Sequence, residues 1–392
     1  MAKQSTLGSK ELNPRQVEEN NLLATKLSEI YKKWGYQEVA PPQVEGLKTL
    51  MAGGGIDSKE ILKLVIDEPV GLRPEMTASI ARAASTRYVA EPRPLRLWAS
   101  GTIFKSREES DGKIVIDESL QSGVELFGIE GMEIEVELLY LLIESLKKLN
   151  IDESSMPILL INHISLMELI ISKFSKSSKE KVTDILSNFD LIEIEKLELD
   201  FDERNTLKLL QELRGSPRNV IKTLESLYGN NKILDSLTKI FNIIEPISNK
   251  YNIQLQLDPT FKPHYELYTG IVFELVCNTR ETPVVIARGG RYDELVKMFN
   301  ENPEDEIAAG FSYSIDKIRE LNTRLETFDT NPERILVAYG PNKTIKDAIE
   351  CQAKLHEKGY VAIIELNSCI NEDHAMKLVN QRKCTKLKWI NS

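Results

Sequence analysis

The segment YTGIVFE at residues 268–274, followed by GGRYD at residues 289–293, decides the fold of this chain. The apolar runs at residues 271–276 and 283–287 predict two strands. Strands and helices do not alternate regularly along the chain, so we expect an α+β fold with a mainly antiparallel sheet flanked by helices. The other strands predicted for this part of the chain cover residues 36–40, 61–66, 95–104 and 120–127.

The rest of the chain predicts a second domain and a helical insertion. Residues 150–250 are rich in Leu, Ile, Lys and Glu at helical spacing, which predicts a helical insertion. Residues 321–332 are typical of a linker, and beyond them the pattern is strand, helix, strand, helix, strand. We therefore expect a core domain at residues 1–325 and a small α/β domain at residues 332–392.

Composition and charge narrow the classes of partner. The 50 Lys and Arg against 60 Asp and Glu give a net charge of -10. Nucleic-acid affinity rests largely on Lys and Arg that neutralise phosphates, so we expect no nucleic-acid partner. The four cysteines and four histidines are scattered, which predicts neither a disulfide nor a metal site. With no apolar run of membrane-spanning length and no signal peptide, we expect a cytoplasmic protein without a membrane partner.

Four sequence blocks carry a family resemblance. They are LRPEMTA at 72–78, FKSRE at 104–108 running on to QSGVELFG at 121–128, YTGIVFE with GGRYD, and AGFSYSIDK at 309–317. Together, in this order, they resemble the histidyl-tRNA synthetases, which are class II aminoacyl-tRNA synthetases. The resemblance covers most of the chain. It implies a class II synthetase-like core, followed by a shortened domain similar to the anticodon-binding domain.

The resemblance implies a pocket for histidine. Carboxylates accept hydrogen bonds from the ammonium group and from an imidazole N–H, and hydroxyls and an amide pair with the remaining polar atoms. Gln121 and Glu125 are four residues apart, which puts both on one face of a strand. The alternative for these two is the polar face of a half-buried strand. The residues matching the family's pocket are Glu75, Thr77, Gln121, Glu125, Tyr268 and Tyr292.

The ATP half of the family's site is degenerate in this chain. Adenylation requires cations that hold the triphosphate in fixed geometry. Lys105 and Lys317 match arginines of the family, and a lysine cannot reproduce a planar, bidentate arginine contact. Arg107 matches an acidic residue, and Pro263 matches the arginine that helps to activate histidine. These four departures imply that ATP is not activated here.

A relative of histidyl-tRNA synthetase without these arginines resembles the regulatory subunits of short-form ATP phosphoribosyltransferase. That resemblance implies a non-catalytic subunit without a cofactor, which assembles with the short catalytic subunit. The pair would carry out the first step of L-histidine biosynthesis under feedback inhibition by histidine. By analogy with class II synthetases, we expect a homodimer as the building unit.

Several alternatives stay open at this point. The effector site could be an interface between subunits instead of the pocket. Residues 53–55 are three glycines, which predict either a surface turn or a mobile lid over the pocket. The chain could also be a divergent, active histidyl-tRNA synthetase, or a stand-alone histidine sensor with another partner.

Overall fold

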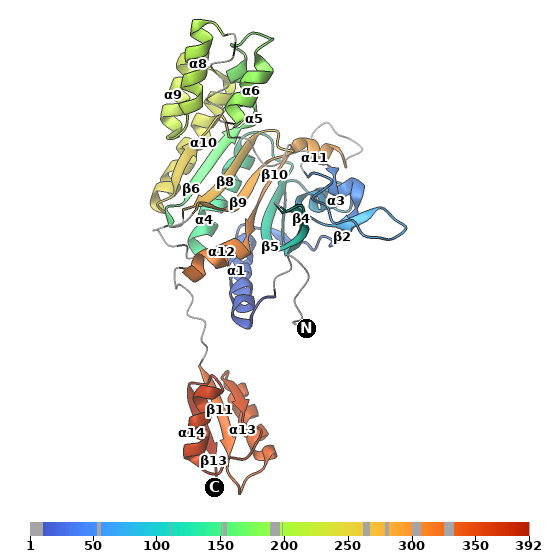
Figure 1. Cartoon of the computed structure of the whole chain (residues 1–392), viewed down its shortest axis with the longest axis vertical. Coiled ribbons are helices and arrows are strands. Elements are labelled where there is room, and N and C mark those ends of the chain that lie inside the picture. The colour runs from blue at the N-terminus through green and yellow to red at the C-terminus, as the bar shows by residue number, and fades with distance from the viewer. Residues whose placement is uncertain are drawn as a thin grey trace. The chain divides into compact units, whose positions relative to one another are not determined.

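The chain folds into two compact units, with the boundary between residues 328 and 329 (Figure 1). Each unit has its own sheet and its own hydrophobic core. None of the helices in the described part of the chain is both long and apolar enough to cross a membrane. The computed structural model describes residues 11–52, 56–109, 111–149, 151, 155–188, 197, 199–261, 267–278, 282–299, 307–324 and 333–391.

The larger unit is built on an eight-stranded sheet in the order β1-β4-β5-β10-β9-β8-β6-β7. The two pairs at its edges are parallel, and the pairs between them are antiparallel. The predicted α+β class with a mainly antiparallel sheet is therefore confirmed. The strands are β1 (Gln37–Glu38), β4 (Leu95–Glu108), β5 (Ile114–Phe127), β6 (Ile158–His163), β7 (Gln254–Leu257), β8 (Ile271–Cys277), β9 (Val284–Arg291) and β10 (Ala308–Ser314).

Helices cover both faces of this sheet. Asn13 caps α1, since its side chain accepts the Gln16 N–H while the Gln16 side chain accepts the Asn13 N–H. Helices α1, α4 and α12 pack on one face, where Tyr31 lies 5.9 Å from Trp98 between ring centroids. Helices α3 and α11 contact the other face. Their bounds are α1 (Pro14–Lys33), α3 (Thr77–Thr86), α4 (Glu133–Lys148), α11 (Asp293–Lys297) and α12 (Ile315–Arg324).

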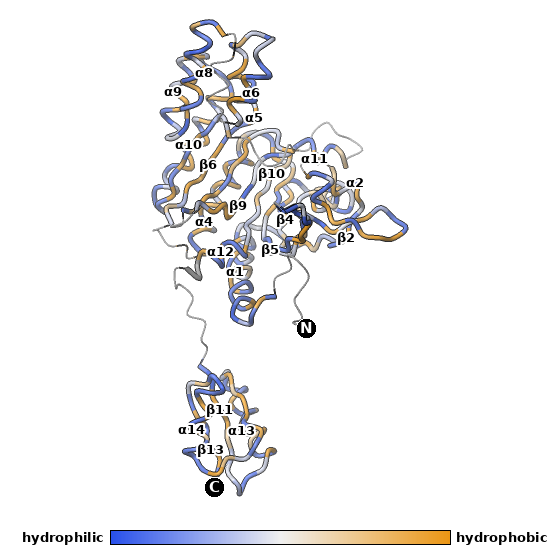
Figure 2. Tube along the Cα trace, in the orientation of Figure 1, coloured by the Kyte–Doolittle hydropathy of each residue, from blue (hydrophilic) through white to orange (hydrophobic). Residues whose placement is uncertain are grey.

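The segment at residues 150–250 is helical over most of its described length but begins with strand β6 of the main sheet. This strand was not predicted, because a short apolar run does not distinguish a buried strand from a helix. Along α8, α9 and α10, hydrophobic and hydrophilic stretches alternate, as expected for helices with one buried face (Figure 2). The helices are α5 (Ile164–Ile171), α6 (Lys179–Asn188), α8 (Phe201–Glu212), α9 (Pro217–Tyr228) and α10 (Lys232–Lys250).

Two local predictions were wrong. Residues 61–66 form only an isolated bridge from Lys63 to Gly71, because Val65 and Ile66 are exposed and have no apolar face to pack against. The predicted linker begins later than residue 321, since α12 continues through Arg324. The elements beside the wrongly predicted strand are the short β2 (Val44–Gly46), α2 (Leu47–Leu50) and β3 (Val70–Leu72).

The smaller unit is a three-stranded parallel sheet in the order β12-β11-β13, as the alternating pattern predicts. Helix α13 packs on one hydrophobic cluster that includes Val337, and α14 packs on another that includes Leu336. Thr344 caps α13 in a capping box with Asp347. The elements are β11 (Arg334–Tyr339), α13 (Ile345–Glu357), β12 (Val361–Ile364), α14 (Glu372–Gln381) and β13 (Lys386–Ile390).

Candidate functional site

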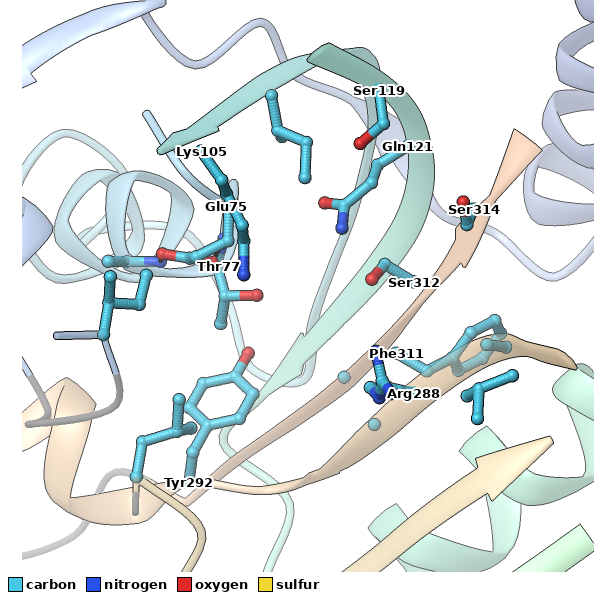
Figure 3. Close-up of a pocket in the computed structure, with 18 of the residues that line it drawn as sticks. Glu75, Thr77, Lys105, Ser119, Gln121, Arg288, Tyr292, Phe311, Ser312 and Ser314 are labelled. Atoms are coloured by element: carbon cyan, nitrogen blue, oxygen red, sulfur yellow. Dashed lines mark hydrogen bonds between the residues drawn. The ribbon is translucent and has the colours of Figure 1, made fainter. Parts of the chain in front are cut away.

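One face of the main sheet forms the floor of a cavity of about 270 Å³ (Figure 3). Side chains alternate between the two faces of a strand, so residues that are partners in the register share a face. Across β8, β9, β10 and β5, the register places Glu274, Arg288, Ser312 and Gly123 side by side. The next row on the same face contains Glu125. The cavity therefore draws its floor from three consecutive strands, β8, β9 and β10, and from β5, which lies far from them in the sequence.

Glu75 joins the wall of the cavity to helix α3. Its carboxylate accepts the backbone N–H of Thr77 and, at 2.9 Å, that of Ala78. These N–H groups belong to the first turn of α3 and have no partner within the helix, so the carboxylate caps the positive end of the helix. Burial raises the pKa of Glu75, and the two backbone N–H groups oppose this shift.

Glu125 lies beneath the cavity and holds two of the residues that line it. Its Oε1 accepts the hydroxyl of Thr77 at 2.7 Å, and its Oε2 accepts the hydroxyl of Tyr292. Burial raises the pKa of Glu125 to about 8, although both hydroxyls stabilise the charged form. Burial and the carboxylate of Glu125 together raise the pKa of Tyr292 well above its ordinary value. The hydroxyl of Tyr292 is therefore a hydrogen-bond donor at neutral pH.

Two glycines allow this close packing. A Cβ atom on Gly310 would lie 1.8 Å from Oε2 of Glu125, and one on Gly290 would lie 2.6 Å from the ring of Tyr268. Neither position can accept a side chain without displacing a cavity residue. Gly290 of GGRYD and Gly310 of AGFSYSIDK are thus explained by the close approach of Tyr268 and Glu125.

The last residues of GGRYD hold Tyr292 in place. Arg291 donates from Nε to Asp293 at 2.8 Å and from Nη1 to Glu135 of α4 at 3.3 Å. Asp293 accepts the N–H of Ala308 at the start of β10, and its own N–H is bonded to the hydroxyl of Thr269. Strand β9, strand β10 and helix α4 therefore fix the backbone on either side of Tyr292.

Comparison with known proteins identifies the family. Residues 8–318 match the family model described as histidyl-tRNA synthetase. A protein of Prochlorococcus marinus named ATP phosphoribosyltransferase regulatory subunit is 52% identical over 387 residues, covering 99% of each chain. A protein of the same name from a Synechococcus species is 46% identical over 390 residues, covering 100% of each chain. The chain belongs to the family of ATP phosphoribosyltransferase regulatory subunits.

Solved structures support the fold of this regulatory subunit. A Bacillus halodurans structure, described as an ATP phosphoribosyltransferase regulatory subunit/histidyl-tRNA synthetase, gives a TM-score of 0.82 at 22% identity, covering 100% of this chain and 99% of that one. A histidyl-tRNA synthetase from a Nostoc species gives 0.78 at 16% identity, covering 100% and 92%. The predicted class II synthetase-like fold is confirmed. The relatives' names also confirm the prediction of a regulatory subunit of histidine biosynthesis, not a catalytic one.

The structure of the regulatory subunit brings most of the predicted histidine-binding residues together. Glu125 is buried below the cavity, and its contacts with the cavity run through Thr77 and Tyr292. Gln121 and Glu125 share one face of β5, as predicted from their spacing. The residues that line the cavity directly are Glu75, Thr77, Gln121, Tyr268 and Tyr292.

Only some of the residues predicted for the degenerate ATP half line the cavity. Lys105 and Lys317 line the same cavity, whereas the exposed Arg107 lies outside it, within 3.6 Å of Glu109. The Nζ atom of Lys105 lies 3.4 Å from the carboxylate of Glu60. The pKa of Lys317 is lowered, mainly by burial and also by the nearby charge of Arg288. Pro263 lies outside the residues that the structure describes, as does the glycine run at 53–55.

Five polar residues of the cavity were not named from the sequence. Strand alternation could have found four of them, because Asp117 and Ser119 share a face with Gln121, and Ser312 and Ser314 share one with Gly310. Arg288 had no signal of its own, since it is a single charged residue ahead of GGRYD. Among the described residues, no group of three or more His, Cys, Asp or Glu side chains could hold a metal ion. The five missed residues are Asp117, Ser119, Arg288, Ser312 and Ser314.

Proposed function

We propose that this chain binds L-histidine in the cavity of the main sheet and thereby controls the short catalytic subunit of ATP phosphoribosyltransferase. The proposal rests on the two kinds of residue that line the cavity. Residues matching the family's amino-acid side are gathered there, while lysines occupy the two described positions that match adenylation arginines. Such a site favours recognition of the amino acid without its reaction.

The chemistry of the cavity supports an amino-acid ligand. Its volume of about 270 Å³ is just below the range of about 300–1,000 Å³ for sites that hold drug-sized molecules, which suits a small ligand such as an amino acid. Glu75 supplies negative charge for an ammonium group, and Gln121 supplies an amide that donates and accepts. A cavity of matched hydrogen-bonding groups rejects ligands that leave these groups unpaired.

Inhibition by histidine requires a coupling between two states of the complex. A ligand shifts an equilibrium only by its difference in affinity for the two states. Couplings of this kind are typically about 1–3 kcal/mol, and they are reciprocal. Binding of the catalytic subunit's substrates should therefore weaken the binding of histidine to the complex by the same factor.

The test is formation of phosphoribosyl-ATP by the catalytic subunit from the same source, with and without this chain, across a histidine titration. We expect activity to rise with the chain and to fall with histidine. Gln121→Ala should raise the histidine concentration for half-inhibition about tenfold, because the loss of a buried hydrogen bond is about 1.4 kcal/mol.

Gln37→Ala is the matched control, because Gln37 is an exposed glutamine at the edge of the same sheet. It should leave inhibition unchanged. If neither chain addition nor histidine changes the rate, the regulatory proposal is wrong. If histidine inhibits the Gln121 variant as strongly as the wild type, the effector site lies elsewhere, for example at an interface between subunits.

The remaining predictions extend this proposal. We expect a homodimer within a cytoplasmic hetero-oligomer, which light scattering of the purified chain with and without the catalytic subunit would measure. Histidine-dependent exchange of pyrophosphate into ATP by the isolated chain would instead establish an active synthetase. We expect none, because Lys105 and Lys317 are point charges that do not reproduce the bidentate contacts of arginine.

A further inference from the structure

Arg288 occupies the centre of the cavity floor. It lies on β9, opposite Ser312 of β10 on one side and Glu274 of β8 on the other. Gly123 continues this row on β5 and has no side chain, so Ser312 and the backbone of β10 pack closely against it. In Figure 3 the side chain of Arg288 projects from the sheet beside Ser312, across the cavity from Glu75 and Thr77.

An ion pair fixes the orientation of the Arg288 side chain. Its Nε donates to Oε1 of Glu274 at 2.5 Å, and the Glu274 side chain is only 12% exposed. An arginine carries five N–H donors in a planar fork, of which four are on the two terminal nitrogens. The contact to Glu274 uses Nε alone, and the side chain of Arg288 remains 40% exposed and lines the cavity. The arginine is thus held along one edge, with its terminal nitrogens as donors for a ligand.

Glu75 and Arg288 place charges of opposite sign on two sides of the cavity. Glu75 lies on one side, where its carboxylate caps α3, with Glu125 buried beneath. Arg288 lies on the other side, and its charge, after burial, lowers the pKa of Lys317, which also lines the cavity. A zwitterionic amino acid matches this layout, with its ammonium group toward Glu75 and its carboxylate toward Arg288.

We propose that Arg288 binds the α-carboxylate of the amino-acid effector and makes the site specific for ligands that carry this group. The proposal rests on the cavity being the histidine site. A planar arginine fork suits a carboxylate better than the point charges of Lys105 and Lys317. Lys105 also lies against Glu60, on the acidic side of the cavity. The hydroxyl of Ser312, next to Arg288 in the register, is a second donor for the same group.

The experiment compares two ligands that differ only at the carboxylate. L-Histidinol keeps the imidazole and the amine of L-histidine but has an alcohol in place of the carboxylate. Isothermal titration calorimetry on the full chain measures both dissociation constants. We expect wild-type protein to prefer histidine about 10–100-fold, the range for a charged hydrogen bond. In Arg288→Ala this preference should collapse to about twofold, with binding of histidinol unchanged.

Matched variants separate the role of Arg288 from general effects. Arg288→Lys keeps the charge but not the fork, and it should show an intermediate preference. Arg87→Ala removes an exposed arginine at the end of α3 and should leave the preference intact. Wild-type protein that binds histidinol as tightly as histidine overturns the proposal without any variant. A full preference retained in Arg288→Ala overturns it as well.

If the proposed binding of histidine to the cavity is itself wrong, the experiment gives a different result. If the wild-type chain, alone and with the catalytic subunit, binds neither ligand, then the cavity is not the histidine site and the role of Arg288 falls with it. If histidine binds and inhibits but the preference is independent of Arg288, only the assignment of the carboxylate is wrong.

Discussion

Two carboxyl groups, Glu75 and Glu125, dominate the chemistry of the cavity at the scale of single residues. Glu125 is buried and Glu75 is half-buried, and burial raises the pKa of each. The free-energy cost of burying these carboxyl groups is offset by the hydrogen bonds that each of them accepts. Glu75 holds the start of α3, and Glu125 fixes the hydroxyls of Thr77 and Tyr292. The sequence named both residues, but it did not predict that Glu125 acts from beneath the cavity.

The raised pKa of Glu125 predicts a pH dependence of stability. Since its folded pKa is about 8 against an ordinary value of 4.5, the folded state binds more protons than the unfolded state between these values. The free energy of unfolding therefore decreases from about pH 4.5 to pH 8 on account of this group. Glu125→Gln, which resembles the neutral carboxyl, should remove this contribution. Urea denaturation of both proteins across this range measures it.

The difference between the two proteins removes the contribution of titrating groups that do not interact with Glu125, and leaves that of Glu125 and the groups coupled to it, Glu75 and Tyr292. His163 has the opposite effect, because burial lowers its pKa to about 4, and it contributes equally to both proteins. The gap in free energy between Glu125→Gln and wild type should change in favour of the variant as the pH rises. A gap that stays constant from pH 4.5 to pH 8 would show that Glu125 is charged throughout.

Gly310→Ala should disrupt the site by steric conflict. The added Cβ would lie 1.8 Å from Glu125 and 2.5 Å from the carbonyl oxygen of Val124. We expect destabilisation at or above the about 1–3 kcal/mol typical of overpacking, measured by chemical denaturation. Gly46→Ala is the control, since nothing lies within 4 Å of its Cβ position and its φ of -59° suits any residue. Equal stabilities of the two variants would contradict this reading of Gly310.

At the scale of elements, Glu137 joins helix α4 to two other parts of the core domain. Arg96 of β4 donates to both oxygens of its carboxylate, at 2.7 and 2.6 Å, and the hydroxyl of Tyr36 donates to it at 3.0 Å. Tyr36 lies between α1 and β1. One carboxylate therefore connects the first helix, the sheet and α4, and the geometry is bidentate, which is the stronger form of an ion pair.

Glu137→Ala should destabilise the core domain by about 1.5–3 kcal/mol, the range for hydrogen bonds to charged groups. The partly buried Arg96 and the buried Tyr36 would both lose their partner. Glu130→Ala, an exposed glutamate just before α4, should change the free energy of unfolding by less than about 0.5 kcal/mol. Equal effects in urea denaturation would show that the contacts of Glu137 contribute nothing beyond an ordinary surface glutamate.

At the scale of the whole molecule, the cavity is lined by residues of the larger unit. Every residue that lines the cavity belongs to the unit that ends at residue 328. A chain that stops there should therefore bind histidine with the affinity of the full chain, within about twofold. Calorimetry on both chains tests this, with circular dichroism as the check on folding. A folded, shortened chain that no longer binds histidine would show that residues beyond 328 take part in the site.

The sequence by itself determined the family, the α+β class, the division into a core and a small α/β domain as a prediction, and six candidate histidine-binding residues. These depend on local patterns and motifs that are contiguous in the chain. The tertiary structure alone decided which side chains share a cavity, because β5 joins β8, β9 and β10 only through its long-range pairing with β10. Arg288 became a candidate for the same reason. Its neighbours Glu274 and Ser312 lie on other strands, and pairing across strands, not spacing along the chain, brings them together.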